Sequence, residues 1–132
     1  MKYLLLGGAG FIGTHLAKRL LKDEHTVTII DSCITSSKPN YDVDFINADL
    51  TTYNINDLDV LISKYDIVYF LAGSVGVSNI VNNPKSTVRN NLGLTLRLIP
   101  LFEKLLYLSY QRCDVNPRLA RLNTLGVLQL CL

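Results

Sequence analysis

KYLLLGGAGFIGTHLAKRLLK, residues 2–22, joins an apolar run, four glycines and an amphipathic run in that order. The run at 2–6 predicts a buried strand, because apolar residues follow one another without alternation. Residues 11–22 predict a helix whose charged side chains face water. The expected inward stripe of this helix consists of Phe11, Ile12, Leu16, Leu20 and Leu21. The chain therefore opens with a strand, a glycine-rich turn and a helix.

The glycines lie where the strand gives way to the helix. Gly8, Gly10 and Gly13 fit G-x-G-x-x-G, and Gly7, Gly10 and Gly13 fit G-x-x-G-x-x-G. In this context the pattern predicts a dinucleotide site, with the diphosphate on backbone N–H groups at the positive end of the helix dipole. A side chain here would fill the space of the phosphate or block contact between helix and strand. The alternative is a tight turn without a ligand, but a turn alone needs one glycine and not four.

The rest of the chain continues to alternate strands and helices. Strands are expected at 26–30, 43–47, 66–73 and 105–109, helices at 55–65 and from Pro84 to 104, and loops at 32–40 and before Asn83. The expected buried faces of the two helices are Ile55, Leu58, Leu61 and Ile62, and Val88, Leu92, Leu96 and Ile99. This order predicts an α/β fold, a truncated Rossmann-type doubly wound parallel sheet of four to five strands.

Two carboxylates follow predicted strands. Asp31 ends the second strand, where a carboxylate accepts hydrogen bonds from the adenosine ribose and repels a 2′-phosphate. Its charge favours NAD over NADP, and Lys38, the nearest base, can at most soften that preference. Asp49 follows the third strand and can accept the amino hydrogens of adenine. The alternatives are a solvated loop carboxylate for Asp31 and a helix cap for Asp49.

Composition excludes several classes of function. A net charge of +2 on 132 residues, without a run of bases, does not indicate nucleic-acid binding. No apolar stretch is long enough to predict a membrane span. The three cysteines are widely spaced and lack a C-x-x-C pair, so that we expect no zinc or disulfide framework and a reducing cytoplasm. His15 and His25 are not at ligand spacing, and no metal site is expected.

Several segments resemble one family, the extended short-chain dehydrogenases/reductases of the NAD-dependent epimerase/dehydratase group, which act on nucleotide sugars. GGAGFIG (7–13) resembles the phosphate loop of that family, and DSCITSSK (31–38) resembles the ribose loop of UDP-galactose 4-epimerases. NADL (47–50) is similar to its adenine turn, YFLAG (69–73) to its fourth strand, and NNPKSTVRNNLGLTLRLI (82–99) to the helix that follows. The resemblance covers about residues 1–100.

The resemblance implies an NAD site and the residues that form it. In the related helix an Asn steadies the active-site strands, and here that residue would be Asn90, with Asn91 as the second choice. The implied cofactor contacts are Gly7, Gly10, Phe11, Ile12, Gly13, Asp31, Ser32, Asp49, Leu50, Leu71, Ala72, Gly73 and Asn90. The implied substrate of full-length relatives is a nucleotide sugar, and helix 84–104 is a candidate surface for a homodimer.

The catalytic pair of the family is absent from the sequence. The resemblance implies a Tyr-x-x-x-Lys, in which the Tyr acts as acid and base and the Lys lowers its pKa. None of the seven tyrosines has a Lys four positions later. We therefore expect residues 1–104 to form the NAD-binding part, and no catalytic residue is assigned.

Residues 105–132 contain no Lys, and the segment 110–132 resembles nothing in the family. Our hypothesis is that it follows a loss of reading frame near residues 104–109, and a genuine short variant with its own C-terminal helix is the alternative. Three functions follow for the chain: an NAD-binding portion of an enzyme, a non-catalytic dinucleotide sensor or interaction module, and a fragment without a stable fold.

Overall fold

The computed structural model describes residues 1–74 and 77–113, which alternate strands and helices. The elements are β1 (Lys2–Leu6), α1 (Phe11–Lys22), β2 (Thr26–Asp31), β3 (Asp44–Asn47), α2 (Ile55–Ile62), β4 (Ile67–Phe70), α3 (Val77–Asn82) and α4 (Pro84–Cys113). The strands form one four-stranded sheet in the order β3-β2-β1-β4, and every neighbouring pair is parallel. The predicted α/β class with a Rossmann-like sheet is confirmed.

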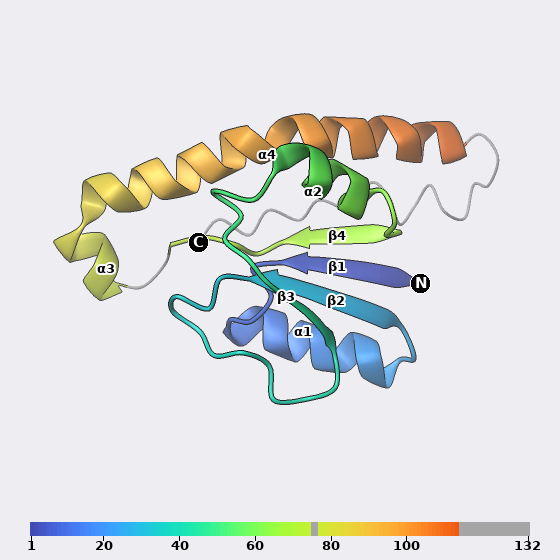
Figure 1. Cartoon of the computed structure of the whole chain (residues 1–132), viewed down its shortest axis with the longest axis horizontal. Helices are drawn as coiled ribbons and strands as arrows, with labels where there is room; N and C mark the ends of the chain where they lie inside the picture. Colours follow the sequence, from blue (N-terminus) through green and yellow to red (C-terminus); the bar gives the residue numbers. More distant parts are fainter. Residues whose placement is uncertain (75–76, 114–132) are drawn as a thin grey trace.

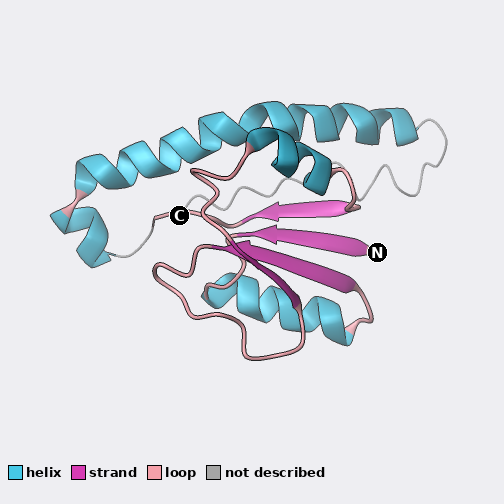
Figure 2. Ribbon diagram, viewed as in Figure 1, coloured by secondary structure: helices cyan, strands magenta, loops and turns pink. Residues whose placement is uncertain are grey.

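The sheet lies between two helical layers, with α1 on one face and α2 and α4 on the other (Figures 1 and 2). Because side chains of a strand alternate between faces, β1 contributes to both cores. Leu4 and Leu6 pack on the side of α2 and α4, whereas Tyr3 and Leu5 pack on the side of α1. Both faces of the sheet are therefore apolar, as the uninterrupted hydrophobic strands predict.

The helix α1 packs against the sheet through small residues. Its buried residues are Gly13, Ala17 and Leu20, and the absence of long side chains at the first two positions lets the helix approach the strands closely. Phe11 is 80% exposed and Ile12 is 48% exposed, so that the predicted inward position of these two residues is wrong. Leu16, Leu20 and Leu21 contact the core as predicted.

The helix α4 buries a different face from the one predicted. Leu94, Leu98, Leu101 and Phe102 join the core, whereas the expected stripe of Val88, Leu92, Leu96 and Ile99 is exposed. Both sets recur at helical spacing, so periodicity alone does not identify the inner one. The prediction of the buried face is therefore wrong for α4 and correct for α2, where Leu58 and Ile62 are buried.

Several predicted boundaries also change. α4 begins at Pro84 as predicted but runs to Cys113, so the expected strand at 105–109 is wrong. A short apolar run fits a helix as well as a strand. α2 ends at Ile62 and not at residue 65, because the amides of Lys64 and Tyr65 turn back to carbonyls three residues earlier.

The segments around the last strand and the tail differ as well. The loop expected before Asn83 contains α3, and the strand expected at 66–73 is shortened to β4. Of the segment 105–132, residues 114–132 lie outside the described residues. Within the described part of the chain, no helix is both long enough and apolar enough to cross a membrane.

Candidate nucleotide-binding site

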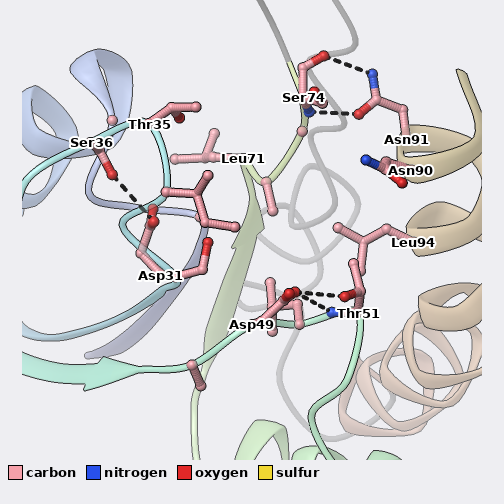
Figure 3. A pocket seen from close by; sticks show the side chains of 18 residues that line it. Asp31, Thr35, Ser36, Asp49, Thr51, Leu71, Ser74, Asn90, Asn91 and Leu94 are labelled. Atoms are coloured by element: carbon pink, nitrogen blue, oxygen red, sulfur yellow. Dashed lines mark hydrogen bonds between the residues drawn. The ribbon is translucent and has the colours of Figure 1, made fainter. Parts of the chain in front are cut away.

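A cavity of about 500 Å³ opens at the carboxyl ends of the four strands. Its walls come from the loops that follow β1, β2, β3 and β4 and from one face of α4 (Figure 3). From β1 the chain adds β2 and β3 on one side of the sheet and then β4 on the other side. Parallel α/β sheets bind ligands at the carboxyl ends of the strands where the order changes direction in this way. The volume is in the range of small-molecule sites, about 300–1,000 Å³.

The cavity brings together most of the residues predicted to hold a cofactor. Those that line it are Gly7, Gly10, Asp31, Ser32, Asp49, Leu50, Leu71, Ala72, Gly73 and Asn90. Phe11, Ile12 and Gly13 do not line it, although they directly follow Gly10 on α1. Asn91, the second choice of the sequence analysis, also lines it, and the lining residues that the sequence analysis missed are Ile34, Thr35, Ser36, Ala48, Thr51, Ser74 and Leu94. Three of these, Ile34, Thr35 and Ser36, belong to the segment 31–38 that resembles a ribose loop, and this resemblance could have identified them.

The glycines of the first loop serve two different purposes. A Cβ at Gly7 would lie 2.3 Å from the Cα of Ala72, and one at Gly13 would lie 2.3 Å from the carbonyl oxygen of Gly8. A Cβ at Gly8 would lie 2.7 Å from the Cβ of Leu5. These three glycines are required by the packing of the protein itself. A Cβ at Gly10 would meet nothing within 4 Å, and Gly10 lines the cavity.

The N-terminus of α1 meets the cavity without a capping side chain. Gly10 is the N-cap, no side chain bonds to the first turn, and the first helical hydrogen bond runs from Thr14 N to Gly10 O at 2.9 Å. The amides of the first turn have no partner within the helix. These amides and the helix dipole favour an anion beside Gly10.

The carboxylate of Asp31 connects the glycine loop to the loop after β2. Its Oδ2 accepts from the backbone N–H of Ala9 at 2.9 Å, and its Oδ1 accepts from the N–H of Cys33 at 2.8 Å. Oδ1 also accepts from the hydroxyl of Ser36 at 3.3 Å (Figure 3). Asp31 is half-buried and is therefore not the solvated loop carboxylate of the alternative interpretation. Lys38 does not line the cavity. Its amino group lies over the ring of Phe45, 5.8 Å from the ring centroid.

The carboxylate of Asp49 holds the turn after β3. Its Oδ1 accepts from the backbone N–H and from the hydroxyl of Thr51, at 2.8 and 2.7 Å. Its carbonyl accepts from the N–H of Tyr53 at 2.8 Å. The N-cap of α2 is Asn54, so Asp49 does not cap this helix as its alternative interpretation proposed.

An asparagine of α4 fixes the loop that follows β4. The side chain of Asn91 accepts from Ser74 N at 2.6 Å and donates to Ser74 O at 3.1 Å (Figure 3). The steadying contact expected of Asn90 is thus made by Asn91, the second choice. Asn90 is exposed and lines the cavity next to it. Among the described residues, no cluster of His, Cys, Asp and Glu could hold a metal ion.

Comparison with known proteins identifies the family. The model of the "NAD dependent epimerase/dehydratase family" matches residues 3–112. The chain is 31% identical over 103 residues to UDP-glucuronic acid decarboxylase 1 of Danio rerio, covering 78% of this chain and 25% of that protein. It is 37% identical over 116 residues to UDP-glucose 4-epimerase GEPI42 of Cyamopsis tetragonoloba, covering 76% of this chain and 32% of that protein.

A solved structure agrees with this assignment. The UDP-glucose 4-epimerase of Thermus thermophilus, in complex with NAD, superposes with a TM-score of 0.66 at 27% identity, covering 79% of this chain and 34% of the epimerase. The chain thus spans a quarter to a third of the length of these relatives. The chain belongs to the NAD-dependent epimerase/dehydratase family and matches its N-terminal part.

Proposed function

We propose that this chain binds the adenosine diphosphate part of NAD in the cavity at the carboxyl ends of its strands. The observation that carries the proposal is the empty space at Gly10, where an added Cβ would meet no atom within 4 Å. At Gly7, Gly8 and Gly13 the position of an added Cβ is already occupied by protein atoms. Nothing in the packing of the described residues requires a glycine at position 10. A diphosphate seated on the first turn of α1 does require it.

The two ends of the adenosine would meet the two carboxylates. The Oδ2 of Asp31 accepts one hydrogen bond and keeps a lone pair for a ribose hydroxyl, and the charge of the carboxylate disfavours a 2′-phosphate. Lys38 is held over Phe45 and would not compensate that charge, which supports NAD over NADP. Asp49 receives both of its side-chain hydrogen bonds at Oδ1, and its Oδ2 would accept the amino group of adenine.

In a complete relative this site would serve the conversion of a nucleotide sugar. Bound NAD supplies hydride transfer at the nicotinamide. The 132 residues contain no Tyr-x-x-x-Lys to move the accompanying proton. The chain would therefore hold and orient the dinucleotide without catalysing the reaction on its own.

Calorimetric titration of the purified protein with NAD, and with NADP as the comparison, tests the proposal. Micromolar-range affinity for NAD with at least tenfold weaker NADP is the expected result. Denaturant unfolding of the same sample establishes that a cooperative fold is present. A cooperatively folded protein that does not bind NAD would contradict the proposal, and equal affinity for NADP would contradict the role of Asp31.

The exposed stripe on α4 is proposed as the surface of a homodimer. Val88, Leu92 and Leu96 are 63%, 55% and 59% exposed and recur every four residues, so they form one apolar line. A second copy presenting the same line would bury both, as a twofold interface does. Light scattering should give the mass of a dimer for the wild type and of a monomer for Leu92→Asp. Val60→Asp on α2, at a similarly exposed position, is the control that should leave the mass unchanged.

A further inference from the structure

A second polar side chain of α4, Arg97, reaches the opposite wall of the cavity from Asn91. Its Nη1 donates to the carbonyl oxygen of Thr51 and its Nη2 to that of Tyr53. These acceptors lie 46 and 44 residues earlier in the chain, in the turn that follows β3. The guanidinium therefore ties α4 to the segment that carries Asp49.

One residue, Thr51, forms hydrogen bonds to both Arg97 and the carboxylate of Asp49. Thr51 accepts from Arg97 with its carbonyl and donates to Asp49 with its N–H and its hydroxyl. Tyr53 also bonds in both directions, since its N–H donates to the carbonyl of Asp49. The turn 49–53 is thus held on one side by Asp49 and on the other by Arg97.

The chemistry of this clamp requires an arginine. Two carbonyl groups that are two residues apart are met by the planar fork of a guanidinium, whereas a lysine presents a single point charge. Within the described residues, Arg97 donates to main-chain oxygens and to no carboxylate. The side chain accordingly fixes a backbone and does not form an ion pair.

We propose that Arg97 is a positioning residue that sets the base selectivity of the nucleotide site by fixing the turn of Asp49. This inference rests on the proposed NAD site. Leu94 lies between the two clamps of α4, Asn91 and Arg97, and lines the cavity with Asp49 and Thr51 (Figure 3). Without Arg97, the Asp49 carboxylate would no longer be held toward the amino group of adenine.

A pair of dinucleotides tests the inference. Nicotinamide hypoxanthine dinucleotide carries a carbonyl oxygen where adenine has its amino group, so a fixed Asp49 should reject it. Wild-type protein should bind NAD at least about tenfold more tightly than this analogue, the factor expected for one hydrogen bond to a charged group. In Arg97→Gln and Arg97→Lys the ratio should fall below about threefold, mainly through weaker binding of NAD.

The controls separate positioning from a general loss of structure. Arg89→Gln removes an exposed cation from the same helix and should leave the ratio unchanged. Asp49→Asn should lower the ratio as Arg97→Gln does, and the double variant should show no further loss, because both changes disable one contact. A general destabilisation would lower both affinities together and keep their ratio.

Each outcome bears on a specific proposal. A wild type that binds NAD selectively, with Arg97 variants that retain the selectivity, would overturn the inference and leave the NAD site intact. A wild type that binds both dinucleotides equally would also overturn the inference, because Asp49 would then not distinguish the amino group of adenine from a carbonyl oxygen. A folded wild type that binds neither would contradict the NAD site itself, and this inference with it.

Discussion

Replacing Gly10 by serine should weaken nucleotide binding without weakening the fold. Gly10 has φ −73° and ψ −178°, an extended conformation that any residue adopts, and its Cβ position is empty to 4 Å. Serine is also a better N-cap than glycine by a few tenths of a kcal/mol. The free energy of unfolding of Gly10→Ser should therefore stay within about 0.5 kcal/mol of the wild type, with the shift toward stability.

The effect on the ligand follows from the same geometry. The new side chain would occupy the space beside the first turn of α1, where the proposed diphosphate would accept hydrogen bonds from backbone amides. Losing one hydrogen bond to a charged group costs about 1.5–3 kcal/mol, which is about a 10- to 100-fold rise in the Kd for NAD. Calorimetry gives this Kd, and urea unfolding gives the stability of the same preparation.

A matched variant in the same loop should behave in the opposite way. In Gly13→Ala the new Cβ lies 2.3 Å from the backbone oxygen of Gly8, so that the helix must shift at a cost of about 1–3 kcal/mol. The pair separates a glycine kept for a ligand from one kept for packing. Gly10→Ser with wild-type affinity for NAD would refute the reasoning, and so would a Gly10→Ser protein that is destabilised as much as Gly13→Ala.

Three further changes probe the specificity and the stability of the fold. Asp31→Asn should raise the Kd for NAD about tenfold and abolish discrimination against NADP in calorimetry, and an unchanged ratio of the two affinities would count against the ribose assignment. Leu98→Ala, at a fully buried position, should cost about 2–5 kcal/mol in urea unfolding, whereas Val60→Ala, at an exposed position of α2 outside the proposed dimer surface, should cost less than about 0.5; similar losses would mean that α4 does not pack as described. Burial raises the pKa of Tyr3 above its ordinary value of 10.0, so the neutral phenol is favoured in the folded state. The contribution of this residue to stability is complete below pH 10 and is lost as the pH rises through the raised pKa. Tyr3→Phe should therefore reduce the loss of stability at alkaline pH in unfolding curves measured from about pH 8 to 12. An unchanged loss would contradict its assignment to Tyr3.

The strand, glycine turn and helix at the start of the chain could be predicted from sequence because each depends on its own residues. A buried strand, a glycine turn and a helix follow one another within residues 2–22, and each is specified by its own residues. The parallel sheet then follows from the alternation of strands and helices. The two roles of the glycines could not be separated in the same way, because the atoms that fill the space at Gly7 belong to Ala72, 65 positions away.

The orientation of the helices depends on information that periodicity does not contain. In α1 the pattern favours Phe11 and Ile12 as inward residues because they are large and apolar, but close packing on a strand selects Gly13 and Ala17. In α4 two apolar stripes satisfy the same helical period. Which of them faces the sheet is decided by the position of α4 relative to β4, which the helix sequence alone does not specify.

The same limit explains why the polar residues of α4 that build the cavity were missed or ranked second. Asn91 and Arg97 lie at positions that a helical pattern assigns to solvent, and each acquires its role from a partner far along the chain, Ser74 and Thr51. Both partners are backbone groups in loops, which no side-chain pattern reveals. The residues that would touch the dinucleotide follow from the chemistry of the loops, whereas those that hold the loops in place require the fold. Substitution of Arg97, which does not line the cavity, should consequently alter binding through the geometry of the cavity and not through a direct contact with the ligand.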